Sequence, residues 1–204
     1  MEYLILGFIT GLSLIFAIGA QNIFVIEQGL KKQFVFLVCL ICSISDFILI
    51  FLGIFLFHFF YQYFNIFIEF SLNILLIIFL LYFVYSKINK FSANVDFNTD
   101  VKETSQSQII FKTLGFTYLN AHVYSDTVFF LGNFSKNFLI DEKIYFGAGA
   151  SIASLMFFFG LGYLSTYFSK HAQSEKTWKY INLFIITFMS VLTIYMIKET
   201  LYLL

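Results

Sequence analysis

Long apolar runs separated by short polar stretches make up most of this chain of 204 residues. Each run holds about 20 residues, the length that an α-helix needs to cross the hydrocarbon core of a bilayer. The pattern therefore predicts an all-α integral membrane protein with six transmembrane helices. Their predicted ranges are Tyr3–Ile26, Phe34–Phe57, Ile66–Tyr85, Ile109–Leu131, Ile144–Phe168 and Trp178–Leu203.

Composition supports this class and removes others. Hydrophobic residues make up 60% of the chain and charged residues 12%, whereas soluble domains carry about 25% charged residues. The apolar runs leave no room for a soluble domain, so we expect the lipid bilayer to surround most of the protein. The net charge is zero, which gives no sign of a nucleic-acid partner.

Lysine placement predicts the orientation in the membrane, because cytoplasmic loops carry an excess of basic residues. Nine of the lysines lie in or beside the first, third and fifth loops, and three lie on the opposite side: Lys136, Lys143 and Lys198. We therefore expect both termini outside. The polar stretch 86–108 is predicted to be a cytoplasmic linker between two three-helix halves, 1–85 and 109–204.

The two halves share short sequence matches. Ser43-Ile44-Ser45-Asp46 in the second helix matches Ser151-Ile152-Ala153-Ser154 in the fifth, which pairs Asp46 with Ser154. A weaker match pairs Ile18-Gly19-Ala20-Gln21 with Leu119-Asn120-Ala121-His122. Short apolar segments also match by chance. Because three helices per half force opposite orientations, we predict two inverted three-helix repeats, an arrangement of transporters with a site near the middle of the membrane.

Asp46 lies in the middle of the second predicted helix. A carboxylate at that depth costs ~2.5–3.5 kcal/mol on insertion scales. Small residues at helical spacing, including Cys42, Ser43 and Gly53, share its face and predict that it points toward other helices. A structural carboxylate bonded to a neighbouring helix is the alternative to a group that exchanges a proton for a cation.

A second polar cluster lies within the fourth predicted helix. It contains Asn120, His122, Tyr124 and Asp126, and apolar residues precede and follow it. We predict that Asp126 belongs to a site and that His122, four residues before it, can share its proton. The alternatives are a polar helix end near the membrane surface and a packing role for the histidine.

Gln21 and Asn22 follow Gly19 inside the first apolar run. Buried amides need partners, and glycine permits a local break that frees backbone groups. Broken helices line transporter sites, although an amide pair can also join two helices. Gly7 and Gly11 form a GxxxG pattern that favours close helix packing.

Two other features receive simpler interpretations. Cys39 and Cys42 form a CxxC pattern, but four thiolates for zinc are lacking, so we predict packing residues and neither a metal site nor a cofactor. A membrane thiol–disulfide carrier is the alternative.

Glu27 and Trp178 fall near helix ends and are expected to reach the membrane surface.

These segments together resemble one family. Gly19-Ala20-Gln21-Asn22, the "ISD" of Ile44-Ser45-Asp46, and Ala150–Gly160 look like segments of the lysine/arginine exporter (LysE) family. Thr117–Thr127 is similar to the family segment TWLNPHVYLDT, and the resemblance covers nearly the whole chain. It is closest to the branch that exports basic amino acids.

The resemblance implies a secondary transporter, not an enzyme, that exports lysine or arginine across a bacterial inner membrane. Asp46 and Asp126 would bind the cationic substrate or a coupling proton, and Gln21, Asn22, Asn120, His122 and Tyr124 would complete the site. Exporters of neutral amino acids or metal cations on the same fold are the alternatives. Ala20 and Ala121 stand where the family often has proline, so the two helices are either straighter here or broken at Gly19 and Asn120 alone.

Overall fold

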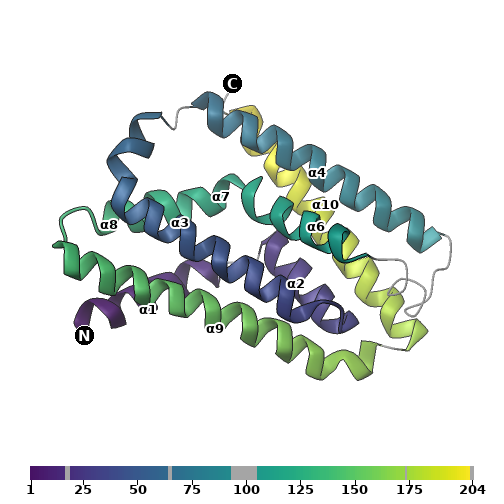
Figure 1. Ribbon diagram of the computed structural model, residues 1–204. Coiled ribbons are helices and arrows are strands. Elements are labelled where there is room, and N and C mark those ends of the chain that lie inside the picture. Colours follow the sequence, from purple (N-terminus) through teal and green to yellow (C-terminus); the bar gives the residue numbers. More distant parts are fainter. Residues whose placement is uncertain (17–18, 64–65, 93–104, 173, 203–204) are drawn as a thin grey trace.

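A computed structural model describes residues 1–16, 19–63, 66–92, 105–172 and 174–202. The described chain is helical and contains no strand, as predicted (Figure 1). The helices are α1 (Glu2–Ile15), α2 (Ala20–Lys31), α3 (Val35–Tyr63), α4 (Ile66–Ser92), α6 (Gln106–Tyr118), α7 (Ala121–Tyr124), the π-helix η1 (Ser125–Phe130), α8 (Leu131–Phe134), α9 (Ile140–Ala172) and α10 (Glu175–Tyr202).

Three described helices are long and apolar enough to cross a membrane: Val35–Phe57, Ile140–Lys170 and Lys176–Lys198. Helices α1 and α2, bent by 85° relative to each other, make a fourth span if they are counted together. In α4, the described apolar part is the shorter segment Asn73–Asn89. These criteria support a membrane protein with three or four spans, so the predicted number of six stays a prediction.

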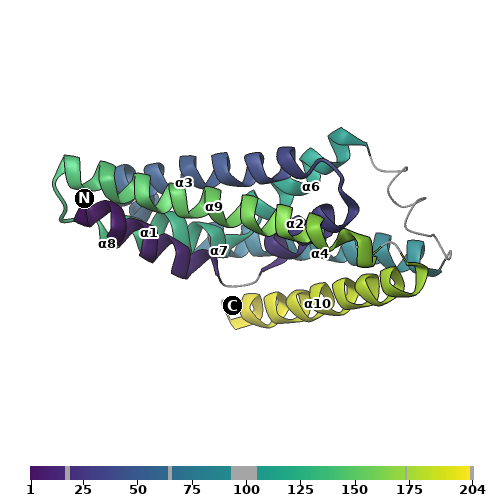
Figure 2. The ribbon, with the colours of Figure 1, turned by 90° about the horizontal axis from the view of Figure 1, so that it is seen from below.

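Helix α9 is the centre of the packing. It runs beside both α1 and α3, whereas α4 and α10 pack on each other and α10 lies at the outside of the bundle (Figures 1 and 2). Glycine allows α1 and α9 to meet backbone to backbone. A Cβ atom at Gly7 would fall on Phe146 O, and one at Gly11 would lie 2.9 Å from Ala150 Cα. The GxxxG prediction of close packing is confirmed.

An aromatic cluster joins the helices that surround the middle of the bundle. The ring of Phe116 in α6 lies 5.0 Å from that of Phe24 in α2. It also lies 4.9 Å and 5.1 Å from the rings of Phe79 and Phe83 in α4. All four are buried. Tilted and edge-on contacts of this kind fix the position of α2 against α4 and α6.

Helices extend into both ends of the predicted linker 86–108. Helix α4 continues through Ser92, and α6 begins at Gln106. Ser105 Oγ accepts a hydrogen bond from Gln108 N at 3.3 Å, while Gln108 Oε1 accepts from Ser105 N. This reciprocal capping box satisfies two backbone donors and fixes the start of α6. Polar composition alone does not distinguish the end of a helix from a loop.

Candidate functional site

The first predicted break is confirmed at Gly19. Helix α1 ends at Ile15, and α2 begins at Ala20 after Gly19 in an extended conformation (φ −119°, ψ −175°). The side chain of Asn22 reaches back across the break, where its Nδ2 donates to Ile15 O at 3.3 Å. This bond satisfies one carbonyl that the end of α1 leaves without a helical donor.

A second break interrupts the polar cluster of the fourth predicted helix. Helix α6 ends at Tyr118, and α7 begins at Ala121. Here Tyr124 Oη donates to Tyr118 O at 2.9 Å, so again a side chain after the break bonds the last carbonyl before it. Both breaks therefore form without proline, and the helices that follow them begin at Ala20 and Ala121.

A π-helix follows the second break and contains Asp126. The wider turn of a π-helix shifts the register of the side chains relative to an α-helix, and such segments occur frequently at functional sites. Thr127 Oγ1 donates to Val123 O at 2.6 Å within this segment. The fourth predicted helix is thus a series of short helical pieces rather than one regular helix.

The two breaks face a common cavity of about 400 Å³, a size typical of small-molecule sites. Five of the seven predicted site residues line it: Gln21, Asn22, Asp46, Asn120 and Asp126. Its apolar wall includes residues of α1, α3, α4, α9 and α10, such as Leu14, Ile50, Leu80, Phe158 and Met196. The tertiary structure thus brings together polar residues that are up to 105 positions apart in the sequence.

Asp46 points inward, as its small neighbours predicted. It is 3% exposed, and its Oδ2 accepts a hydrogen bond from Ser154 Oγ at 2.7 Å. These are the two residues that the sequence match between the halves paired with each other. At the cavity, this bond connects the Asp46 carboxylate of α3 to the Ser154 hydroxyl of α9.

Gln21 contributes a second polar group at the cavity. Its side chain is buried, and among the described residues its Nε2 has no oxygen or nitrogen acceptor, although the thiol of Cys42, a weak acceptor, lies beside the Gln21 side chain. A buried donor without a partner costs about 1–3 kcal/mol, which a bound acceptor would recover. The first turn of α2 also has backbone amides that lack acceptors within the helix.

Of the two remaining predicted site residues, Tyr124 and His122, only Tyr124 has a side chain that the structure describes. The Tyr124 hydroxyl bonds the carbonyl of Tyr118 across the second break. Tyr124 is not among the described residues that line the cavity. The His122 side chain lies outside what the structure describes, so its predicted proton sharing with Asp126 stays a prediction.

Sequence reasoning missed two polar residues that line the cavity, Thr127 and Tyr195. Thr127 directly follows Asp126, and this adjacency to a predicted site residue could have identified it. Tyr195 comes from α10, where an aromatic residue at helical spacing is usually a packing or lipid-facing residue. Only the packing of α10 places it at the cavity.

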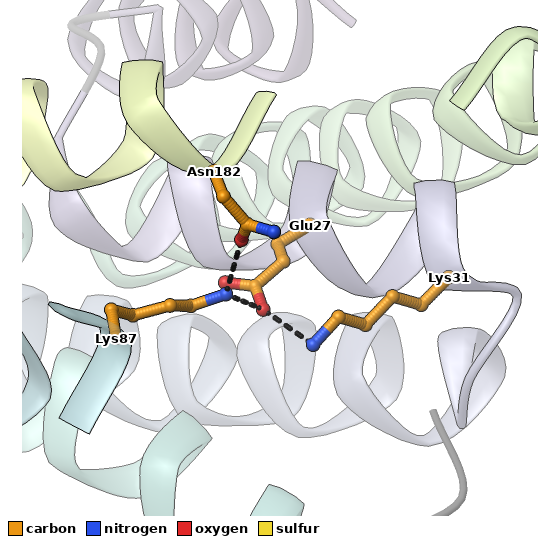
Figure 3. Close-up of polar contacts among 4 residues, drawn as sticks. All are labelled: Glu27, Lys31, Lys87 and Asn182. Carbon is orange, nitrogen blue, oxygen red and sulfur yellow. Dashed lines mark hydrogen bonds and ion pairs between the residues drawn. The ribbon is translucent and has the colours of Figure 1, made fainter. Parts of the chain in front are cut away.

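The expected surface position of Glu27 and Trp178 is wrong. Both are 2% exposed. Glu27 belongs to a buried ionic cluster with Lys31, Lys87 and Asn182 (Figure 3), and the ring of Trp178 lies over the ammonium group of Lys31. Lys87 and Asn182 are far from Glu27 in sequence, so the partners that allow a buried charge were not visible in the pattern. No group of three or more metal-ligating side chains is found within the described ranges.

Comparison with known proteins places the chain in a family. A family model described as "LysE type translocator" matches residues 12–200. The arginine exporter protein ArgO of Pectobacterium atrosepticum is 32% identical over 181 residues, 88% of each chain. ArgO of Klebsiella pneumoniae is 29% identical over 198 residues, 97% of this chain and 94% of the relative. No solved structure matches the chain. This protein belongs to the family of LysE type translocators.

Proposed function

We propose that this protein is a transporter, not an enzyme, that exports basic amino acids such as arginine and lysine across the inner membrane of a bacterium. The observation that carries the proposal is the cavity, which places two acidic residues, Asp46 and Asp126, beside two broken helices. The relatives carry the name arginine exporter, which supports the same class of substrate.

The cavity offers a partner for each charge of a basic amino acid. The carboxylates of Asp46 and Asp126 suit the cationic side chain and the α-ammonium group. Helix α2 begins at the cavity with Ala20, Gln21 and Asn22, and the positive end of a helix favours an anion such as the α-carboxylate. The buried Nε2 of Gln21 is a further donor for that carboxylate.

Asp46 binds the cationic substrate and a coupling proton in turn in this proposal. A desolvated carboxylate needs a positive partner or a proton, and the hydroxyl of Ser154 holds its position in either state. When the cation leaves, the proton takes its place. The transporter would thereby use the membrane gradients, as a secondary transporter does.

The same geometry supports six membrane spans in two inverted three-helix repeats, residues 1–85 and 109–204. After the two breaks, the helices begin again at Ala20 and Ala121. The weaker sequence match pairs these two alanines with each other. Asp46 and Ser154, the pair from the stronger match, touch each other. Equivalent positions meet when they lie near the axis that relates two repeats. We place the linker 86–108 in the cytoplasm and both termini outside, following the lysine distribution.

Efflux of labelled amino acids from bacterial cells that express the protein tests the function. We expect faster loss of labelled arginine and lysine than from cells with an empty vector. Labelled citrulline, which has nearly the shape of arginine but no side-chain charge, should leave no faster than from the control cells. If arginine and lysine are retained by cells that hold the inserted protein, the substrate class is wrong.

Replacing both cysteines with serine separates export from thiol exchange. Cys39 and Cys42 are buried and free, and Cys39 Sγ donates to Phe158 O at 3.1 Å. Thiol exchange needs an accessible thiolate, whereas a serine hydroxyl can keep the hydrogen bond. The Cys39→Ser/Cys42→Ser protein should export arginine within about twofold of the wild-type rate. Complete loss of efflux from inserted protein would instead favour the thiol carrier.

A further inference from the structure

The ionic cluster around Glu27 joins three helices (Figure 3). Glu27 Oε1 in α2 accepts from Lys31 Nζ at 2.8 Å and from Lys87 Nζ of α4 at 2.6 Å. Lys87 Nζ also donates to Asn182 Oδ1 of α10 at 3.1 Å. The charged side chains are 3–9% exposed, so these are buried ion pairs.

Trp178 covers the same two ammonium groups. Its ring centroid lies 5.5 Å from Lys31 Nζ and 5.9 Å from Lys87 Nζ, within the range of cation–π attraction. Carboxylate, amide oxygen and indole face together form a set of groups that binds organic cations. An ammonium or guanidinium group finds in this cluster the same partners that the lysine side chains use.

The cluster is distinct from the cavity and lies closer to the lysine-rich side of the protein. None of its residues lines the cavity. Asn182 lies ten residues before the cavity-lining Leu192 in α10, about 15 Å along the helix. Under the proposed orientation, a substrate that enters from the cytoplasm meets the level of the cluster before that of the cavity.

Physical cost argues against a purely stabilising role. Burying charged groups costs desolvation that their attraction often does not exceed, and apolar replacements of buried ion pairs are frequently as stable. A site that exchanges one cation for another adds little to that cost, because the carboxylate is never left buried without a positive partner. The side chain of a lysine substrate ends in the same ammonium group that Glu27 already holds.

We propose that Glu27, Asn182 and Trp178 form a second binding site for the cationic side chain of the substrate, in which Lys31 and Lys87 take the substrate's place between transport cycles. This inference rests on the proposed export of basic amino acids. Because Lys87 bonds both α2 and α10, its displacement by a substrate also releases one link between the first and second halves of the chain.

The fluorescence of Trp178 provides a direct test, since it is the single tryptophan of the chain. Purified full-length protein in detergent is titrated with arginine, and the tryptophan emission is recorded. We expect a saturable change in the wild type. In Lys87→Met, which keeps the Glu27–Lys31 pair, half-saturation should occur at an arginine concentration about tenfold lower, because one competing cation is removed.

Three further variants make the test specific. Lys136→Met, the same change at an exposed lysine outside the cluster, should titrate like the wild type. Asp46→Asn should keep the fluorescence response, which separates the cluster from the cavity. Glu27→Gln should lose the response. If Glu27→Gln does not fold because two ammonium groups stay buried, the comparison of Lys87→Met with Lys136→Met decides.

The outcomes separate this inference from the proposed function. A protein that exports arginine but shows no fluorescence change at concentrations that saturate export overturns the second site and leaves the function intact. The same half-saturation in Lys87→Met and wild type also overturns it. A saturable response that tightens in Lys87→Met, from a protein without efflux, supports the site while the export proposal fails.

Discussion

Replacing Asp46 with asparagine is expected to abolish arginine export while leaving the protein inserted in the membrane. Asparagine has nearly the same volume, and its carbonyl oxygen can still accept the hydrogen bond from Ser154 Oγ that Asp46 accepts at 2.7 Å. The substitution removes the charge and the titratable proton from the cavity. Removing one partner of a buried charge interaction costs about 2–5 kcal/mol, which corresponds to a loss of roughly 30-fold to several-thousand-fold in binding.

Initial efflux of labelled arginine, divided by the amount of inserted protein, measures this effect. Asp141→Asn is the matched control, because Asp141 is an exposed residue in the first turn of α9 and outside the cavity. It should export at about the wild-type rate. Insertion of Asp46→Asn should be unchanged or better, since a neutral side chain is less costly in a bilayer than a carboxylate. Full export by Asp46→Asn would disprove the assigned role of this carboxylate.

Replacing Gly149 with leucine is expected to destabilise the protein strongly. Gly149 lies in α9 where a Cβ atom would fall on the carbonyl oxygen of Leu4, and its next contact would be Phe8 N at 2.8 Å. The neighbouring atoms are backbone, so a rotamer change cannot relieve the overlap. Helix α1 would have to move away from α9 along the line of Gly7 and Gly11. We expect a loss of about 3 kcal/mol or more.

The midpoint of thermal unfolding of the purified protein, and its yield in the membrane fraction, measure this change. Gly160→Leu is the matched control, because Gly160 lies in the same helix, is exposed, and has open space where a Cβ atom would stand, with no described neighbour within 4 Å. It should leave stability unchanged or raise it by up to about 1 kcal/mol, because leucine favours a helix more than glycine does. Equal stability of the two variants would show that the contact between α1 and α9 is not as close as described.

The local features of the candidate site could be predicted because their causes are local. Glycine at position 19 permits the break that ends α1 and starts α2, and the small residues on one face of α3 turn Asp46 inward. Each depends on residues within a few turns of the same helix. Exposing a polar side chain to the hydrocarbon of a bilayer costs free energy, and this cost confines four further residues to the protein interior: Gln21, Asn22, Asn120 and Asp126.

The predictions that were wrong or incomplete concern partners distant in sequence. Glu27 was expected at the membrane surface because it falls near a helix end, but Lys87, 60 residues away, reaches it from α4. Trp178 is buried for the same reason, since α10 packs it over the ammonium groups of Lys31 and Lys87. Residue type and spacing describe one helix at a time and do not report such contacts.

The sequence by itself therefore determined the class of the protein, the approximate helices, the first break and most of the polar residues that line the cavity. Hydrophobic length, backbone freedom at glycine and the energetic cost of intramembrane charge are properties of single segments. Only the tertiary structure decided that Asp46 bonds Ser154, that Tyr124 braces a break instead of lining the cavity, and that Glu27 holds two lysines. These outcomes depend on how helices approach one another, because a hydrogen bond or ion pair forms only where packing brings both partners within about 3 Å.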